Sequence, residues 1–273
     1  MNLPPAVRYA IIPCGGQGTR MRGLTGGGPK EMLALGGEPV IGRVSRECGA
    51  SGISDLCVVI APGKESIRDY LGPMAGKPGY PQRIDFVEQP TPRGLADAIR
   101  LGWGAPDRPV AVALPDNVFV DGMPAMQQVI ASYCRSGKNT IAIVAISAAE
   151  AASRGPTPVY RGRERGDDFE IAAIPSKGDH ATTFETGGAA TAYTGVGRYV
   201  LLSDAYQIID ELERTAPLGR ERDDIPVLQR LLTMGRLSGC VIRGDFLDVG
   251  LPTGYRHAAA RLARASAAAA GRM

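Results

Sequence analysis

The residues best suited to chemistry lie in one short segment, residues 9–33, with the sequence YAIIPCGGQGTRMRGLTGGGPKEML. An apolar run leads into Gly15, Gly16 and Gly18, and the cations Arg20 and Lys30 follow. Glycine lets backbone N–H groups approach phosphate oxygens closely, and it adopts left-handed backbone conformations without steric cost. The segment therefore predicts a phosphate-binding loop whose charge comes from two basic side chains.

Two well-known glycine loops do not fit this segment. A dinucleotide-binding fingerprint that starts at Gly16 needs a further glycine at position 21, which is Met21. A Walker loop needs Gly-Lys followed by Ser or Thr, and neither Lys30 nor Lys64 has that context. The remaining interpretations are another kind of phosphate loop, or a tight strand-to-helix turn without a ligand.

Two carboxylates occupy positions where a ligand site is expected. Asp116 follows the apolar run at residues 110–114, and Asp248 stands in the sequence FLDVG. Doubly wound folds bind ligands beyond the carboxyl ends of their strands, and two carboxylates with substrate phosphates are a normal set of Mg²⁺ ligands. The alternative is that each aspartate only begins a turn, because aspartate is a common turn residue.

Other polar residues suggest a reaction without a protein base. The histidines, His180 and His257, have no serine, cysteine or carboxylate in a suggestive position beside them. Phosphoryl or nucleotidyl transfer to an anionic phosphate needs no such base. Gln89 and Gly94 lie at a strand-to-helix crossing where an amide could contact a base edge, and Lys177 is a further candidate cation. The plainer interpretations are an ordinary loop and a solvated lysine.

The elements that must position these residues alternate between strand and helix patterns. We expect strands at residues 9–13, 56–60, 84–87, 110–114 and 140–146, and helices at 40–49, 64–71, 94–102 and 123–136. This order predicts an α/β fold with a doubly wound, mainly parallel, Rossmann-like sheet.

The second half of the chain continues this fold. Residues 148–195 are rich in Gly, Pro and charge, which predicts a small β-hairpin elaboration rather than a second core. A strand at 191–201, helices at 203–214 and 225–232, a strand pair within 239–250 and a C-terminal helix at 253–273 follow. We therefore expect residues 1–273 to form a single domain.

Composition limits the possible partners and compartment. The chain has 273 residues, 44% of them hydrophobic, and a net charge of +3, so no general attraction to nucleic acid or membrane is expected. Five scattered cysteines without a C-x-x-C spacing argue against disulfides and zinc, and we find no signal peptide or membrane span, which together predict a cytoplasmic protein. Cys14, beside the glycine loop, is either a reactive thiol or a small packing residue.

Taken together, these motifs resemble those of the sugar-1-phosphate nucleotidylyltransferases, over residues 9–255. The GG-x-GTR signature lies at residues 15–20. PKEML at 29–33, TGVGRYVL at 194–201 and DVGLPTGY at 248–255 are similar to UTP:glucose-1-phosphate uridylyltransferases. EQPTPRGLADA at 88–98 and LPDNVF at 114–119 are more similar to glucose-1-phosphate thymidylyltransferases.

The resemblance implies a role for each matched residue at the nucleotide. Arg20 and the glycine loop would hold the triphosphate, and the loop's binding residues would be Cys14, Gly15, Gly16, Gly18 and Thr19. Lys30 would neutralise charge at the α- and β-phosphates. Gln89 and Gly94 would contact a pyrimidine base. Asp116 and Asp248 would hold Mg²⁺.

The resemblance also implies an acceptor site that departs from the family pattern. Lys177 would bind the sugar phosphate and act in catalysis, with Ser176 and Gly195 beside the sugar. Ser176 stands where the family has a glutamate, and the stretch at 219–224 is altered too. Loss of a charged hydrogen bond should weaken binding of an ordinary hexose. We therefore expect a substituted sugar phosphate or a sugar-like polyol phosphate as acceptor.

Several alternatives stay open on the sequence. UTP is favoured over dTTP, but both bases offer the same edge to Gln89. A non-catalytic, nucleotide-sugar-binding regulatory protein of this fold is the main alternative to an enzyme, and an NAD(P)-dependent oxidoreductase is weaker because its third glycine is absent. Family members are commonly dimers or tetramers, so the resemblance also implies a homo-oligomer.

Overall fold

A computed structural model of the chain describes residues 4–147, 161–176, 191–215 and 222–270. Its centre is a nine-stranded mixed sheet in the order β5-β4-β1-β6-β11-β8-β12-β10-β9, in which only β11 and β10 run against the others. The strands are β1 (Tyr9–Cys14), β4 (Asp55–Ile60), β5 (Arg83–Glu88), β6 (Val110–Ala113), β8 (Asn139–Ser147), β9 (Arg161–Arg165), β10 (Asp168–Ala173), β11 (Thr191–Leu201) and β12 (Leu237–Val241).

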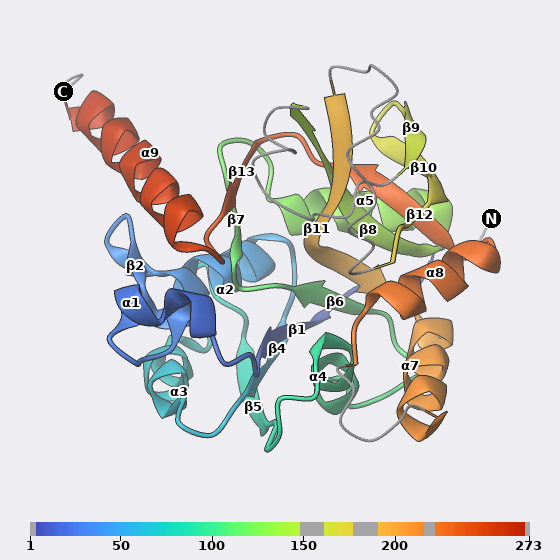
Figure 1. The fold of residues 1–273 in the computed structure, drawn as a ribbon, viewed down its shortest axis with the longest axis horizontal. Helices are drawn as coiled ribbons and strands as arrows, with labels where there is room; N and C mark the ends of the chain where they lie inside the picture. Colours follow the sequence, from blue (N-terminus) through green and yellow to red (C-terminus); the bar gives the residue numbers. More distant parts are fainter. Residues whose placement is uncertain (1–3, 148–160, 177–190, 216–221, 271–273) are drawn as a thin grey trace.

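Helices cover both faces of this sheet, so the fold has three layers (Figure 1). One face carries α2 (Val40–Ala50), α3 (Glu65–Leu71) and α5 (Ala125–Ser136). The other face carries α4 (Leu95–Gly102), α7 (Ser203–Thr215) and α8 (Ile225–Thr233). This arrangement confirms the predicted doubly wound α/β fold.

The alternation of side chains in β1 explains why the chain needs both layers. Ala10, Ile12 and Cys14 are buried with the α2, α3 and α5 side, whereas Ile11 is buried with the α4, α7 and α8 side. Successive residues of a strand point to opposite faces, so a strand that is apolar at every position must be covered twice. The predicted strands at 9–13, 56–60, 84–87 and 140–146 fall within strands of this sheet, and the one at 110–114 extends a single residue beyond β6.

A small ribbon lies between the main sheet and the C-terminal helix. It is formed by β7 (Asn117–Val120) and β13 (Asp245–Asp248), which pair antiparallel with Asn117 opposite Asp248. Helix α9 (Pro252–Ala270) packs beside this ribbon through Tyr255 and Ala258, and then extends away from the sheet (Figure 1). The ribbon therefore determines where Asp248 lies relative to the end of β6.

The prediction of one strand pair within residues 239–250 was wrong in its pairing. Both strands exist, but β12 joins the main sheet beside β8, and β13 pairs with β7 instead. The reason is the left-handed Gly244, at φ 128°, which directs the chain out of the sheet after β12. The hairpin within residues 148–195 is present in the described residues as β9 and β10, which extend the edge of the main sheet.

The remaining elements are short segments around the glycine loop and near α3. They are η1 (Thr19–Met21), α1 (Arg22–Thr25), η2 (Lys30–Met32), β2 (Ala34–Leu35), β3 (Glu38–Pro39) and η3 (Gly72–Met74). Among the described residues, the helices are too short or too polar to cross a lipid bilayer.

Candidate functional site

A cavity of about 520 Å³ opens beside the carboxyl ends of β1, β5 and β6. A volume of this size suits a small-molecule ligand. Its walls are formed by the glycine loop, the start of α4 and the turn after β6. The lining residues are Pro13, Gly15, Gly16, Gln17, Gly18, Thr19, Arg20, Met21, Lys30, Glu31, Gln89, Pro92, Gly94, Leu95, Ala98, Leu114, Pro115, Asp116 and Gly250.

The glycine loop forms one wall of this cavity. It runs from the end of β1 into η1, and Gly18 adopts the left-handed conformation at φ 59° just before η1. Arg20 is exposed, lines the cavity and forms no ion pair with the described part of the chain. Its position at the cavity is compatible with binding an anionic ligand, and the predicted role of Arg20 at a phosphate stays a prediction.

Gly15 lies in close contact with another predicted site residue, Gln89. A Cβ atom at Gly15 would lie 1.8 Å from Oε1 of Gln89, which is far inside van der Waals contact. Only a glycine allows the loop and the Gln89 side chain to approach this closely. The sequence placed these residues in separate roles, and the fold brings them into direct contact.

Lys30 and Asp116, which both line the cavity, form an ion pair. The Lys30 Nζ lies 2.7 Å from Oδ2 of Asp116, and both side chains are partly buried. Burial by itself lowers the pKa of Lys30, but the Asp116 carboxylate and Glu31 outweigh it and raise the pKa above the usual lysine value. The ammonium therefore stays charged at neutral pH, and its other two N–H donors can reach a ligand.

Asp116 and Asp248 face the same small space. A Cβ atom added at Gly250 would lie 3.0 Å from Oδ2 of Asp116 and 3.2 Å from Oδ1 of Asp248. The backbone N–H of Gly250 donates to Asp248 Oδ1, at 2.9 Å, and the Val249 N–H donates to the Asp116 carbonyl, at 2.8 Å. The ribbon thus brings together two carboxylates that are far apart in the sequence.

These carboxylates fit a magnesium ion that also binds phosphate oxygens. Mg²⁺ is usually held by one or two carboxylates together with substrate phosphates and water. Within the described ranges, no group of three or more His, Cys, Asp or Glu side chains could hold a metal by itself. A metal at Asp116 and Asp248 would take its further ligands from phosphate oxygens or water.

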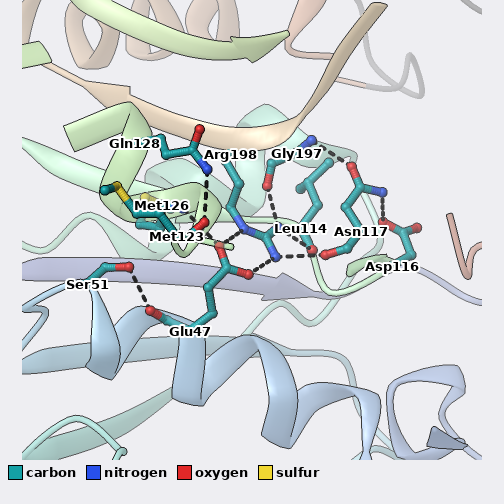
Figure 2. A network of polar contacts seen from close by, with 10 residues as sticks. All are labelled: Glu47, Ser51, Leu114, Asp116, Asn117, Met123, Met126, Gln128, Gly197 and Arg198. Atoms are coloured by element: carbon teal, nitrogen blue, oxygen red, sulfur yellow. Dashed lines mark hydrogen bonds and ion pairs between the residues drawn. The ribbon is translucent and has the colours of Figure 1, made fainter. Parts of the chain in front are cut away.

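A buried arginine, Arg198, holds the turn that carries Asp116 through hydrogen bonds to its backbone (Figure 2). Arg198 is fully buried and makes a bidentate ion pair with Glu47 of α2, at 2.9 and 2.7 Å. Its guanidinium also donates to the carbonyls of Leu114 and Asn117, on either side of Asp116. Arg198 lies in the TGVGRYVL motif but is not among the site residues predicted from the sequence.

Asn117 completes the link between this network and the site. Its Oδ1 accepts from the Gly197 N–H, at 2.6 Å, and its Nδ2 donates to Oδ1 of Asp116, at 3.2 Å. The register of β11 against β8 shifts between Val196 and Tyr199, around Arg198. Such irregularities in a strand redirect a side chain, here Arg198 toward Glu47.

We expect the Arg198→Met variant to lose about 3–5 kcal/mol of unfolding free energy, because Glu47 would keep a buried charge without its partner. The measurement is urea unfolding of the purified protein. Arg135→Met is the matched control, since Arg135 pairs with Asp168 at the surface and such pairs contribute about 1 kcal/mol or less. Equal losses in both variants would contradict a structural role for the buried network.

Gln89 lies deeper in the cavity wall than the sequence suggests. The side chain is 2% exposed, and its Nε2 donates to Oδ2 of Asp97, at 2.7 Å, and to the Gly94 carbonyl, at 3.3 Å. Gly94 has a φ of 112°, and a Cβ atom there would lie 2.4 Å from the Arg222 carbonyl. Both residues line the cavity, but the amide NH₂ of Gln89 already has protein partners.

Glu31 and Lys64 form a buried ion pair that was not predicted from the sequence. Lys64 Nζ lies 3.0 Å from both carboxylate oxygens of Glu31, and both side chains are nearly inaccessible. Glu31 follows Lys30 in the PKEML motif, so the pair fixes η2, which carries Lys30. Glu31 also lines the cavity, and the positive charge of Lys64 offsets the repulsion between the Glu31 carboxylate and an anionic ligand there.

Cys14 packs in the core rather than facing the cavity. It is fully buried among apolar side chains, and burial, followed by the Glu31 charge, raises the pKa of its thiol well above the ordinary value. A neutral, buried thiol is not a nucleophile. Of the two interpretations of the sequence, the packing one is correct.

Gly195 and Ser176, two of the residues expected at the acceptor, are not among the lining residues of this cavity. Gly195 pairs with Ile143 in the main sheet. Ser176 is exposed, and its Oγ accepts from Nε2 of Gln229, at 3.3 Å. Lys177 lies outside the described residues. The predicted acceptor roles of these three residues therefore stay predictions.

The close contact at Gly15 gives a further prediction. In Gly15→Ala, the new methyl group must displace the Gln89 amide, so we expect unfolding free energy to fall by about 1–3 kcal/mol. Thermal unfolding measures this change. Gly16→Ala is the matched control, because a Cβ atom at Gly16 has no neighbour within 4 Å. Equal unfolding temperatures for the two variants would contradict the close contact between Gly15 and Gln89.

Comparison with known proteins gives the class to which this site belongs. Residues 9–265 match the model of the nucleotidyl transferase family, and the chain therefore belongs to that family. This confirms the family resemblance read from the motifs and makes the protein a nucleotidyltransferase.

Curated relatives and solved structures extend the comparison. UTP–glucose-1-phosphate uridylyltransferase 2 of Staphylococcus saprophyticus is 27% identical over 91% of this chain and 89% of its own length. A Bacillus subtilis (strain 168) protein, whose name provisionally assigns it that activity, is 29% identical over 91% of this chain and 94% of its own. A UDP-glucose pyrophosphorylase solved with UDP-glucose has the same fold, with a TM-score of 0.80, 22% identity and coverage of 95% and 99%.

Proposed function

We propose that this protein transfers a nucleoside monophosphate from a pyrimidine nucleoside triphosphate to a sugar 1-phosphate or a sugar-like phosphate, with release of pyrophosphate. UTP is the favoured donor and dTTP the next. The observation that carries the proposal is one cavity lined by the glycine loop, Arg20 and the Lys30–Asp116 pair, with Asp248 close to its lining residue Gly250. Family membership and the names of the relatives support the same reaction.

In the proposed reaction the glycine loop and Arg20 hold the β- and γ-phosphates. Lys30 donates from its free N–H groups to the α-phosphate, where negative charge increases during the reaction. A sugar phosphate oxygen attacks the α-phosphorus in line, the bond from that phosphorus to the bridging oxygen breaks, and pyrophosphate leaves. No side chain has to remove a proton, because the attacking phosphate is already anionic.

We further propose that Asp116 and Asp248 hold Mg²⁺ together with the phosphates. When bound, the ion would neutralise phosphate charge and help to orient the triphosphate. Asn117, which donates to Oδ1 of Asp116, orients that carboxylate toward Gly250. The proximity of the two carboxylates beside Gly250 supports this site.

The acceptor is proposed to differ from glucose 1-phosphate. Ser176 carries no charge, and its hydroxyl already contacts Gln229. A substituted sugar phosphate or a sugar-like polyol phosphate fits this position better than a hexose that requires a carboxylate. Lys177 is proposed as the cation for the acceptor phosphate and Gly195 as a neighbour of the sugar. We also propose a cytoplasmic homo-oligomer, a dimer or tetramer, which light scattering tests.

The experiment is a pyrophosphate-release screen. UTP, dTTP, CTP, ATP and GTP are each combined with glucose 1-phosphate, substituted sugar 1-phosphates and cyclitol 1-phosphates, with Mg²⁺ or with EDTA. We expect release with a pyrimidine triphosphate, only with Mg²⁺, and fastest with an acceptor other than glucose 1-phosphate. Fastest turnover of UTP with glucose 1-phosphate would contradict the interpretation of Ser176. Tight nucleotide-sugar binding without turnover would favour the regulatory alternative.

A further inference from the structure

The amide of Gln89 is held in one orientation by a carboxylate that does not line the cavity. Asp97, in the first turn of α4, is 1% exposed, and its Oδ2 accepts from Nε2 of Gln89, at 2.7 Å. A carboxylate only accepts hydrogen bonds, so the NH₂ end of the amide must face Asp97. The Gly94 carbonyl, also an acceptor, lies on the same side, at 3.3 Å.

The carbonyl end of the same amide is therefore turned toward the glycine loop. Oε1 of Gln89 lies against Gly15, and both residues line the cavity. Within the described residues, no donor is bonded to this oxygen. The oxygen is also not completely enclosed by protein atoms. An acceptor atom thus remains available to a ligand in the cavity.

The guanidinium groups of Arg93 and Arg100 in turn hold the Asp97 carboxylate. Its Oδ1 accepts from Nη2 of Arg93, at 2.8 Å, and lies 3.7 Å from the Arg100 guanidinium. Arg93 also pairs with Glu213 of α7, at 2.8 Å. These contacts fix which of the two Asp97 carboxylate oxygens faces Gln89.

We propose that Asp97 is the positioning residue that makes the base site select a pyrimidine with a protonated ring N3. Uracil and thymine carry an N3–H donor between two carbonyls, and that donor matches Oε1 of Gln89. Cytosine carries an acceptor at N3, which Oε1 repels. The inference rests on the proposed function, because it requires Gln89 to face the base of the bound nucleotide.

The test is the Asp97→Asn variant, which keeps the size of the side chain. Arg93 donates only, so it holds the oxygen of the new amide, whose NH₂ then faces Nε2 of Gln89. The Gln89 amide is driven to rotate, which places an NH₂ group where Oε1 was and removes the preference for N3–H. We expect the ratio of kcat/KM for UTP to that for CTP to fall by about tenfold or more.

The matched control is Asp204→Asn. Asp204 also accepts from an amide, that of Asn139, and from a guanidinium, that of Arg236, but Asn139, unlike Gln89, does not line the cavity. The ratio should not change in this control. Because both nucleotides are measured on one preparation, a smaller folded fraction in either variant does not alter the ratio. An unchanged ratio in Asp97→Asn overturns the inference.

Two further measurements separate this inference from the proposed function. In the Gln89→Leu background, Asp97→Asn should have no additional effect on the ratio, since Asp97 acts through Gln89; an additional effect overturns the inference. Calorimetric titration with UTP and CTP gives the binding ratio without turnover. Selective UTP binding that Asp97→Asn abolishes, in a wild-type protein that releases no pyrophosphate, would support the inference and contradict the proposed function.

Discussion

Replacing Asp116 by alanine is expected to lower kcat/KM for nucleotidyl transfer by about a thousandfold. The carboxylate does two things that alanine cannot do. Its Oδ2 pairs with Lys30, at 2.7 Å, and it faces Asp248 across Gly250, where the metal is proposed to bind. Initial rates of pyrophosphate release at varied Mg²⁺ measure the loss, and excess Mg²⁺ should not restore the rate.

Asp245→Ala is the control for this prediction. Asp245 lies on β13, the strand that ends at Asp248, but its carboxylate is exposed and pairs with Arg261 of α9. We expect activity within about twofold of wild type, because exposed ion pairs contribute little to stability. Activity of Asp116→Ala within tenfold of wild type would mean that the carboxylates beside Gly250 do not serve the reaction.

Replacing Lys30 by alanine is expected to lower kcat about a hundredfold to a thousandfold, with a smaller change in KM. The reason is that Lys30 is proposed to act on charge that increases in the transition state, whereas Arg20 also holds the ground-state triphosphate. Steady-state kinetics with varied nucleotide separate the two constants. Lys77→Ala is the control, because the Lys77 Nζ is exposed and contacts only Met74 among the described residues.

The pH dependence of kcat gives a second check on Lys30. Burial opposes its charge, but Asp116 and Glu31 raise its pKa above the usual value, so the charged form persists to higher pH than in an exposed lysine. The contribution of Lys30 should be complete at neutral pH and disappear only as the pH rises through that raised pKa. A loss of wild-type kcat between neutral and mildly alkaline pH that Lys30→Arg removes would contradict this protonation state.

The sequence predicted the main sheet well, because its signal is local. Residues 9–13 and 110–114 are short, continuous apolar runs between turn residues. Where helices alternate with such runs along the chain, the runs form strands that are covered by helices on both faces of the sheet. The ribbon of β7 and β13 was not predicted as a pair. Each strand has only four residues, and its partner lies more than a hundred residues away. Local pattern carries no information about such a partner.

The site was predicted through residues that face the cavity, whereas the residues that hold them were missed. Arg198 reads as an ordinary strand residue, and only the fold reveals that its guanidinium binds Glu47 and two carbonyls beside Asp116. Asp97 reads as a helix-start carboxylate, but the first turn of α4 places it under Gln89. Buried polar partners depend on tertiary contacts, so spacing along the chain does not identify them.

The most direct test of the proposed reaction is the fate of isotopic label in a sugar phosphate whose non-bridging phosphate oxygens are ¹⁸O. The labelled acceptor is incubated with UTP, Mg²⁺ and the protein, and the products are analysed by mass spectrometry. Direct attack on the α-phosphorus predicts a sugar nucleotide that keeps every labelled oxygen, together with an equal amount of unlabelled pyrophosphate. Release of UMP without a sugar nucleotide, or label in the pyrophosphate, would contradict nucleotidyl transfer to the sugar phosphate.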